Sequence, residues 1–220
     1  MSDDKREFIE QAAPEYWYSY AEELAQTADE IYKTSKGRSV GYIYLNVDGS
    51  EKIERRPYVS RPVLLLYGIA IENLIKGLLI SENTSLLADG KLSKHLHGHD
   101  LKKLTNRLTT FCLTAAEAEL ADLLSSVVPY HGRYPVPKNS ADLSPEIHVT
   151  EGIYFACVQF FERLSIHLYR LNYFGLTAPE GVLFPKLRLQ TLDAKVDFNT
   201  DPYNPMTADE IRRRFISDDC

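Results

Sequence analysis

The chain has 220 residues, with 25 lysines and arginines against 31 aspartates and glutamates, which gives a formal net charge of −6. This balance argues against a strongly basic protein that coats nucleic acid, although it is compatible with a local basic patch. Apolar residues are 44% and charged residues 25% of the chain, as in an ordinary globular domain. We therefore expect one domain, residues 1–175, followed by an appendage, residues 176–220.

The sequence favours a cytoplasmic protein without a membrane partner. Its first ten residues are charged, unlike a signal peptide. Its longest apolar stretch without charge, Pro62 to Ile71, is far shorter than the ~20 residues that a membrane span needs. Cys112, Cys157 and Cys220 form no CxxC pair, which predicts no cysteine zinc site and fits a reducing compartment. We expect no cofactor.

Stretches without proline show where long helices can form, because proline breaks a helix interior. The first predicted helix begins near Pro14 and continues to about Lys33, with apolar residues recurring at helical spacing. Residues 38–57 are different. Strand-forming residues from Tyr42 onward precede Asp48-Gly49, a two-residue turn signal, so this segment predicts a small β-hairpin or an ordered loop.

The middle of the chain predicts three further helices. The helix predicted at residues 60–80 is apolar on nearly all sides, which is typical of a central, buried helix. Another is predicted at residues 100–111. The next begins at Thr114, where Thr114 and Glu117 match a capping box, and ends before Pro129.

The last long helix is predicted at residues 145–173, and Gly175 follows where such a helix would end. Several prolines then divide residues 176–220 into short pieces, with one more short helix expected at residues 208–216. The sequence therefore predicts a mainly α, up-and-down bundle of about five long helices. A small β-hairpin is inserted in the bundle, and an irregular C-terminal arm follows it.

One candidate site surrounds two charges on the buried helix. Glu72 and Lys76 are one helical turn apart among apolar residues, and burying both is costly unless other groups pair with them. This pattern indicates either a structural ion network or a polar pocket in the core. Prolines stiffen the loop around Arg133, whose guanidinium suits a carboxylate or a phosphate. The candidate residues, expected close together, are Glu72, Lys76, His99, Asp100, Arg133 and Tyr134.

Three alternating histidines, His95, His97 and His99, precede Asp100. Such a cluster could bind zinc. The interpretation that we favour is a loop leading into the next helix, with His99 or Asp100 as its N-cap. We therefore predict no metal site.

A second candidate site lies on the helix predicted at residues 145–173. Arg163, His167 and Arg170 are spaced so that they form one basic stripe. A histidine beside an arginine can act as a general acid or base while the arginine stabilises a phosphate. The competing interpretation is a solvated face that carries a histidine.

Three segments, in this order, resemble a known family: Tyr67 to Leu79, Gly98 to Leu104, and Gly132 to Pro137. They are similar to the helical bundles of the higher eukaryotes and prokaryotes nucleotide-binding (HEPN) superfamily, and the resemblance covers about residues 16–173. It implies an up-and-down helical bundle, frequent dimers, and links to RNA cleavage, toxin–antitoxin pairs and phage defence.

Ribonuclease members of that family carry an arginine, four to six intervening residues and a histidine. The nearest string here, from Arg163 to His167, has three intervening residues. The favoured hypothesis is therefore a non-enzymatic HEPN-like module that acts through a protein partner or RNA in stress response or phage defence. One alternative is a metal-independent RNA endonuclease that uses Arg163 and His167. Another is a protein that binds a small ligand or nucleotide.

We also expect a homodimer. The helix predicted at residues 145–173 carries aromatic residues on several sides, and one neighbouring helix cannot cover all of them. Either the C-terminal arm or a second subunit must cover the remainder. A twofold interface there would bring two copies of the Arg163, His167 and Arg170 stripe together as a basic groove.

Overall fold

A computed structural model describes residues 3–58, 60–131 and 147–185, and the described residues are mainly helical. Within them, β1 and β2 form a hairpin between α2 and α3, and the short strands β3 and β4 pair after α6. The mainly α fold class is confirmed. The elements are α1 (Asp3–Gln11), α2 (Pro14–Ser35), β1 (Ser39–Leu45), β2 (Glu51–Pro57), α3 (Arg61–Glu82), α4 (Leu101–Thr105), α5 (Ala115–Ser126), α6 (Glu151–Asn172), β3 (Leu176–Thr177) and β4 (Leu183–Phe184).

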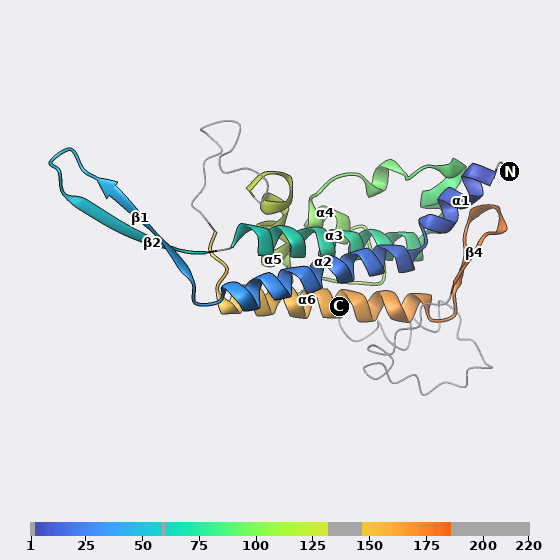
Figure 1. Cartoon of the computed structure of the whole chain (residues 1–220). Coiled ribbons are helices and arrows are strands. Elements are labelled where there is room, and N and C mark those ends of the chain that lie inside the picture. The colour runs from blue at the N-terminus through green and yellow to red at the C-terminus, as the bar shows by residue number, and fades with distance from the viewer. Residues whose placement is uncertain (1–2, 59, 132–146, 186–220) are drawn as a thin grey trace.

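The helix α3 lies at the centre of the bundle (Figure 1). Near its C-terminal end, a Cβ at Gly77 would lie 3.2 Å from Trp17 of α2 and 3.5 Å from Leu168 of α6. Near its N-terminal end, the ring of Tyr67 lies edge-on to Tyr154 of α6. Those contacts make α3 parallel to α6, and α2 runs antiparallel to both.

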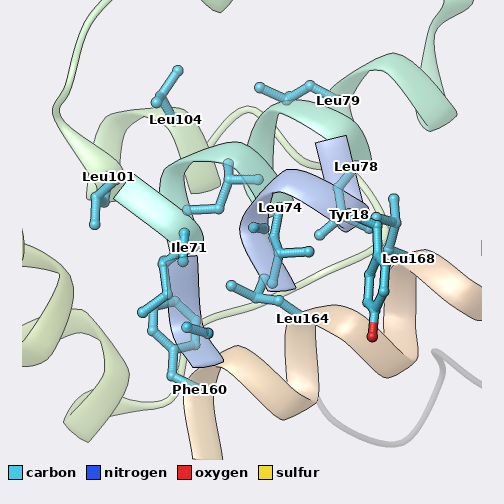
Figure 2. Packing of buried hydrophobic residues seen from close by; sticks show 14 of the residues in the cluster. Tyr18, Ile71, Leu74, Leu78, Leu79, Leu101, Leu104, Phe160, Leu164 and Leu168 are labelled. Carbon is cyan, nitrogen blue, oxygen red and sulfur yellow. The ribbon is translucent and has the colours of Figure 1, made fainter. Parts of the chain in front are cut away.

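The apolar pattern of α3 is explained by neighbours on several sides. Figure 2 shows Leu74 and Leu78 of α3 packed with Leu164 and Leu168 of α6, and all four are completely buried. Burying one such side chain contributes about 1.5–3 kcal/mol. By length and composition α3 could also cross a membrane, but 72% of its most apolar window is buried inside the protein, as in the core helix of a folded domain.

A close approach on the opposite side of α3 requires a glycine. A Cβ at Gly68 would lie only 2.5 Å from Cγ2 of Val128, in the π-helical turn that follows α5. The capping box predicted at the start of α5 is confirmed, because Thr114 accepts from the backbone N–H of Glu117 while the Glu117 carboxylate accepts from that of Thr114. This local pairing fixes where α5 begins.

The structure differs from the prediction in the number and length of its helices. Within the described residues α2, α3 and α6 each have 22 residues, rather than about five helices being long. The helix predicted at residues 100–111 is wrong in length, because α4 ends at Thr105. Beyond it, the backbone N–H groups of Thr109 and Thr110 each donate to the Glu82 carboxylate at 2.8 Å, which holds that segment in a non-helical conformation.

The two termini of the bundle also differ from expectation. Helix α1, whose Ile9 is completely buried, was not predicted from the sequence. The start of α6 was placed too early, because α6 begins at Glu151, after Thr150 accepts a hydrogen bond from the backbone of Ile153. The short helix predicted at residues 208–216 lies outside the described residues. Of the arm, Val182 and Phe184 pack into the core.

The predicted hairpin is confirmed, but its turn is different. Asn46 N–H donates to the carbonyl of Ser50 at 2.8 Å, and Gly49 N–H donates to that of Asn46 at 2.9 Å. The loop therefore holds Val47, Asp48 and Gly49 rather than two residues, and Gly49 takes the positive φ of +82° that this turn requires. The hairpin extends away from one end of the bundle, at the left of Figure 1.

Candidate functional site

The structure brings three of the predicted site residues together between α3 and the segment before α4. Lys76 Nζ lies 2.6 Å from Glu72 Oε1, and His99 Nδ1 lies 2.9 Å from Glu72 Oε2. The side chains of Glu72 and Lys76 are only 7% and 13% exposed, whereas that of His99 is 47% exposed. The cluster is thus a buried ion pair reached from solvent through one histidine.

The remaining residues of this predicted site are not in the cluster. Asp100 is the N-cap of α4, where it accepts from the backbone N–H of Lys103 at 2.9 Å and pairs with the Lys103 ammonium. The backbone hydrogen bond, followed by the side-chain one, lowers the pKa of the Asp100 carboxyl. Arg133 and Tyr134 lie outside the described residues.

The neighbouring histidines do not converge. His95, His97 and His99 are all exposed, and His95 borders a pocket of about 420 Å³ beside Glu82 and Arg107. Among the described residues, no three histidine, cysteine, aspartate or glutamate side chains come close enough to hold a metal ion.

His167 does not lie on a solvated basic stripe, and that expectation was wrong. The residue is only 7% exposed, and its Nε2 lies 2.9 Å from Oγ1 of Thr110. Because the Thr110 hydroxyl donates to the Glu82 carboxylate, the imidazole must donate its Nε2–H to Thr110. Burial, followed by the charges of Arg170 and Arg163, lowers the pKa of His167 to about 4.

Arg163 is held in place by a separate set of hydrogen bonds. Its Nε donates to the Glu117 carboxylate at 2.6 Å, and its Nη2 donates to the same carboxylate and, at 2.6 Å, to the carbonyl of Cys112. The guanidinium also lies 3.9 Å from the ring centroid of Phe111. Although burial opposes it, the hydrogen bonds from Arg163 and Thr114 lower the pKa of Glu117. Arg163 therefore ties α6 to the start of α5.

Two polar networks, of which only that of His167 is buried, thus account for the predicted catalytic pair. Arg163 is bound to Glu117, and His167 is bound to Thr110, so the two side chains do not face a common open site. The predicted basic groove would need His167 at the surface, and its burial removes that groove.

A basic pocket at the base of the hairpin was not predicted from the sequence. This pocket has a volume of about 330 Å³ and lies where α2 ends and β2 leads into α3. We call it the hairpin-base pocket. It is lined by Tyr32, Ser35, Lys36, Gly37, Arg38, Ser39, Arg55, Arg56, Tyr58 and Val149.

The four basic residues of the hairpin-base pocket are not equivalent. Lys36 pairs with Glu151 at 2.8 Å, and Arg56 pairs with Glu54 at 3.0 Å. Arg38 and Arg55 are exposed, and no side chain in the described part of the protein pairs with either. Their guanidinium groups are therefore free to bind an anion.

Aromatic rings complete this pocket. Tyr58 is 56% exposed, and its backbone N–H donates to the carbonyl of Arg38 at 3.0 Å. Tyr32 stacks on Tyr154 of α6 with 3.8 Å between ring centroids. The sequence signal for this pocket was the presence of arginines at the beginning and at the end of the hairpin segment. The antiparallel register brings these two parts of the sequence to the same end of the ribbon.

A third polar feature, also missed, joins the three long helices. Tyr67 of α3 and Tyr154 of α6 both donate their hydroxyls to Oδ1 of Asp29 on α2, the latter at 2.9 Å. Burial first, and then Asp29, raise the pKa of Tyr154 to about 12. These two hydrogen bonds link α3 and α6 to α2, which gives the cluster a structural role.

Comparison of the chain with protein-family models, curated proteins and solved structures gives no match. The HEPN-like resemblance therefore rests on the three sequence segments that carry it. Two of these segments contain Glu72, Lys76 and His99, which the fold brings into one cluster.

Proposed function

We propose that this chain is a non-enzymatic, HEPN-like module that binds single-stranded RNA at the hairpin-base pocket and works in cytoplasmic stress response or phage defence. One observation carries the proposal. In a protein with a net charge of −6, Arg38 and Arg55 line the same open pocket without a described acidic partner, beside the exposed ring of Tyr58.

This combination suits a single strand of nucleic acid. Arginine guanidinium groups bind backbone phosphates, and an exposed tyrosine can stack on a base, which contributes about 1–3 kcal/mol per base. Because few basic residues take part, we expect a modest affinity and a shallow dependence of that affinity on salt. Each phosphate contact to a single strand contributes about −0.7 to the slope of log K against log salt.

The matching experiment is fluorescence anisotropy with a labelled single-stranded RNA at several salt concentrations. Reversing one pocket charge, Arg38→Glu, should lower the affinity by about tenfold and make the salt slope less steep by ~0.7. Arg6→Glu is the matched control, because Arg6 is an exposed residue of α1 at the opposite end of the bundle. Equal losses in both variants would contradict a local site.

Competition with a mononucleotide distinguishes the binding of an RNA strand from the binding of a small nucleotide. If a nucleoside monophosphate competes as well as the RNA strand does, the pocket takes a small nucleotide and the RNA proposal fails. If only the strand competes, several nucleotides contribute to binding, as an RNA-binding surface requires.

The proposal that the protein is not an enzyme rests on the burial of His167 and on the binding of Arg163 to Glu117. A general base must reach the proton that it removes, and Nε2 of His167 is already engaged by Thr110. We therefore expect purified protein to leave total RNA intact on a gel. Cleavage by the wild type that is lost in His167→Ala would instead support the endonuclease.

A further inference from the structure

The hairpin is a two-stranded ribbon with different chemistry on its two faces. Its register pairs Gly41 with Arg55, Ile43 with Ile53, and Leu45 with Glu51. Because side chains alternate along a strand, these six residues share one face of the ribbon. We call it the apolar ribbon face. The residues between them lie on the other face.

That other face is satisfied within the ribbon. Arg56 pairs with Glu54 at 3.0 Å, lies 5.2 Å from the ring centroid of Tyr42, and donates to the hydroxyl of Tyr44 at 3.4 Å. The aromatic residues on this face therefore already have polar and cationic neighbours.

The apolar ribbon face has no such cover. Ile43 and Ile53 are each 63% exposed and Leu45 is 75% exposed. Neither strand packs extensively on a helix in the described part of the chain, and Figure 1 shows the ribbon extending away from the bundle. A two-stranded ribbon on its own is only marginally stable in water, so a partner would also stabilise it.

The order of residues on this face is self-complementary. Along β2 it runs Glu51, Ile53, Arg55, that is, an acid, an apolar residue and a base. Consider two ribbons stacked with these faces against each other. A twofold axis that lies between them, crosses the strands at right angles and passes the Ile53 position makes the strands of the two ribbons antiparallel. It places Glu51 of one copy over Arg55 of the partner subunit, and the reverse pair forms by symmetry.

The same operation matches shapes along β1. It places Leu45 of one copy over Gly41 of the partner subunit, where the absence of a side chain leaves room. A Cβ at Gly41 would meet no heavy atom within 4 Å in the single chain. Ile43 and Ile53 then lie at the centre, and the ion pairs lie at the rim, as in other specific interfaces.

We propose that the apolar ribbon face is a homodimer interface, in which two hairpins stack face to face and antiparallel. The two bundles then lie at opposite ends of the paired ribbons. This inference goes beyond RNA binding and does not depend on it, since it rests on the charge order and exposure of the ribbon alone. In the dimer Arg55 pairs with Glu51 of the partner subunit, so phosphate binding at the hairpin-base pocket falls to Arg38, which lies outside the paired strands.

Charge exchange tests the proposed pairing directly. Glu51→Arg places two arginines opposite each other, and Arg55→Glu places two glutamates opposite each other. Each variant alone should weaken dimerisation by about tenfold or more, because like charges then face each other at the interface. Mixing the two variants should restore the dimer, as should the double exchange within one chain. Light scattering after size exclusion measures the mass, which is 25.1 kDa for one chain.

Two controls keep the test decisive. Circular dichroism should show both variants folded, since the changes are at exposed positions. Phe155→Lys changes an exposed aromatic residue of α6 and should leave the dimer intact. A monomeric wild type at micromolar concentration overturns the proposal. So does a dimer that Phe155→Lys dissociates while both ribbon variants retain it.

Discussion

Replacing Glu72 by alanine should lower the free energy of unfolding by about 3 kcal/mol or more, because it leaves the Lys76 ammonium buried without its carboxylate. The side chain of Lys76 is only 13% exposed, and its Nζ lies 2.6 Å from Glu72. Chemical denaturation followed by circular dichroism measures the change. For a chain of this size, that loss corresponds to a melting temperature lower by about 6–12 °C.

The matched control for Glu72→Ala removes both charges. Glu72→Leu combined with Lys76→Met keeps a similar volume and strands no ion, so we expect it to retain most of the wild-type stability. If the single and double variants lose equal stability, the loss comes from packing and not from an unpaired charge. An unchanged melting temperature in Glu72→Ala would show that the cluster is solvated.

Lowering the pH from 7 to 4 should cost about 3 kcal/mol of stability through His167 alone. Burial, Arg170 and Arg163 lower the pKa of His167 in the folded protein to about 4, below its usual value of about 6.5. Between those two values the unfolded chain binds a proton that the folded protein does not. The contribution of His167 is therefore complete above pH 6.5 and is lost as the pH falls towards 4.

Carboxylates also titrate in this range, so the measurement compares two proteins. His167→Gln keeps a side chain that can donate to Thr110 but cannot take up the proton. Unfolding curves at pH 7 and pH 4 should show a smaller loss in the variant, by about 3 kcal/mol. Equal losses in both proteins would mean that His167 is protonated in the folded state.

Local patterns in the sequence were sufficient for several elements. The nearly continuous apolar character of residues 60–80 predicted a buried helix, since only a helix surrounded by others can bury all its sides. The capping box of Thr114 and Glu117 was predictable because its two partners are three residues apart. Strand-forming residues near Tyr42 likewise predicted the hairpin.

The partners of Glu72 were partly predictable for an energetic reason. Two charges on a buried helix need each other and further polar groups, and the sequence offered both His99 and Arg133 as partners. The structure places His99 Nδ1 2.9 Å from Glu72, although 27 residues separate them in the chain. The need for a partner came from burial, whereas its geometry came from the fold.

Contacts between segments that are distant in the sequence decided the features that local patterns did not predict. The chain leaves the helical conformation after Thr105 because Glu82, 27 residues before Thr109, binds the backbone there. His167 is buried because Thr110, 57 residues away, meets it across the bundle. Arg38 and Arg55 come to one pocket only through strand register. The periodicity of the sequence does not predict such contacts, because each depends on how helices and strands pack once they have formed.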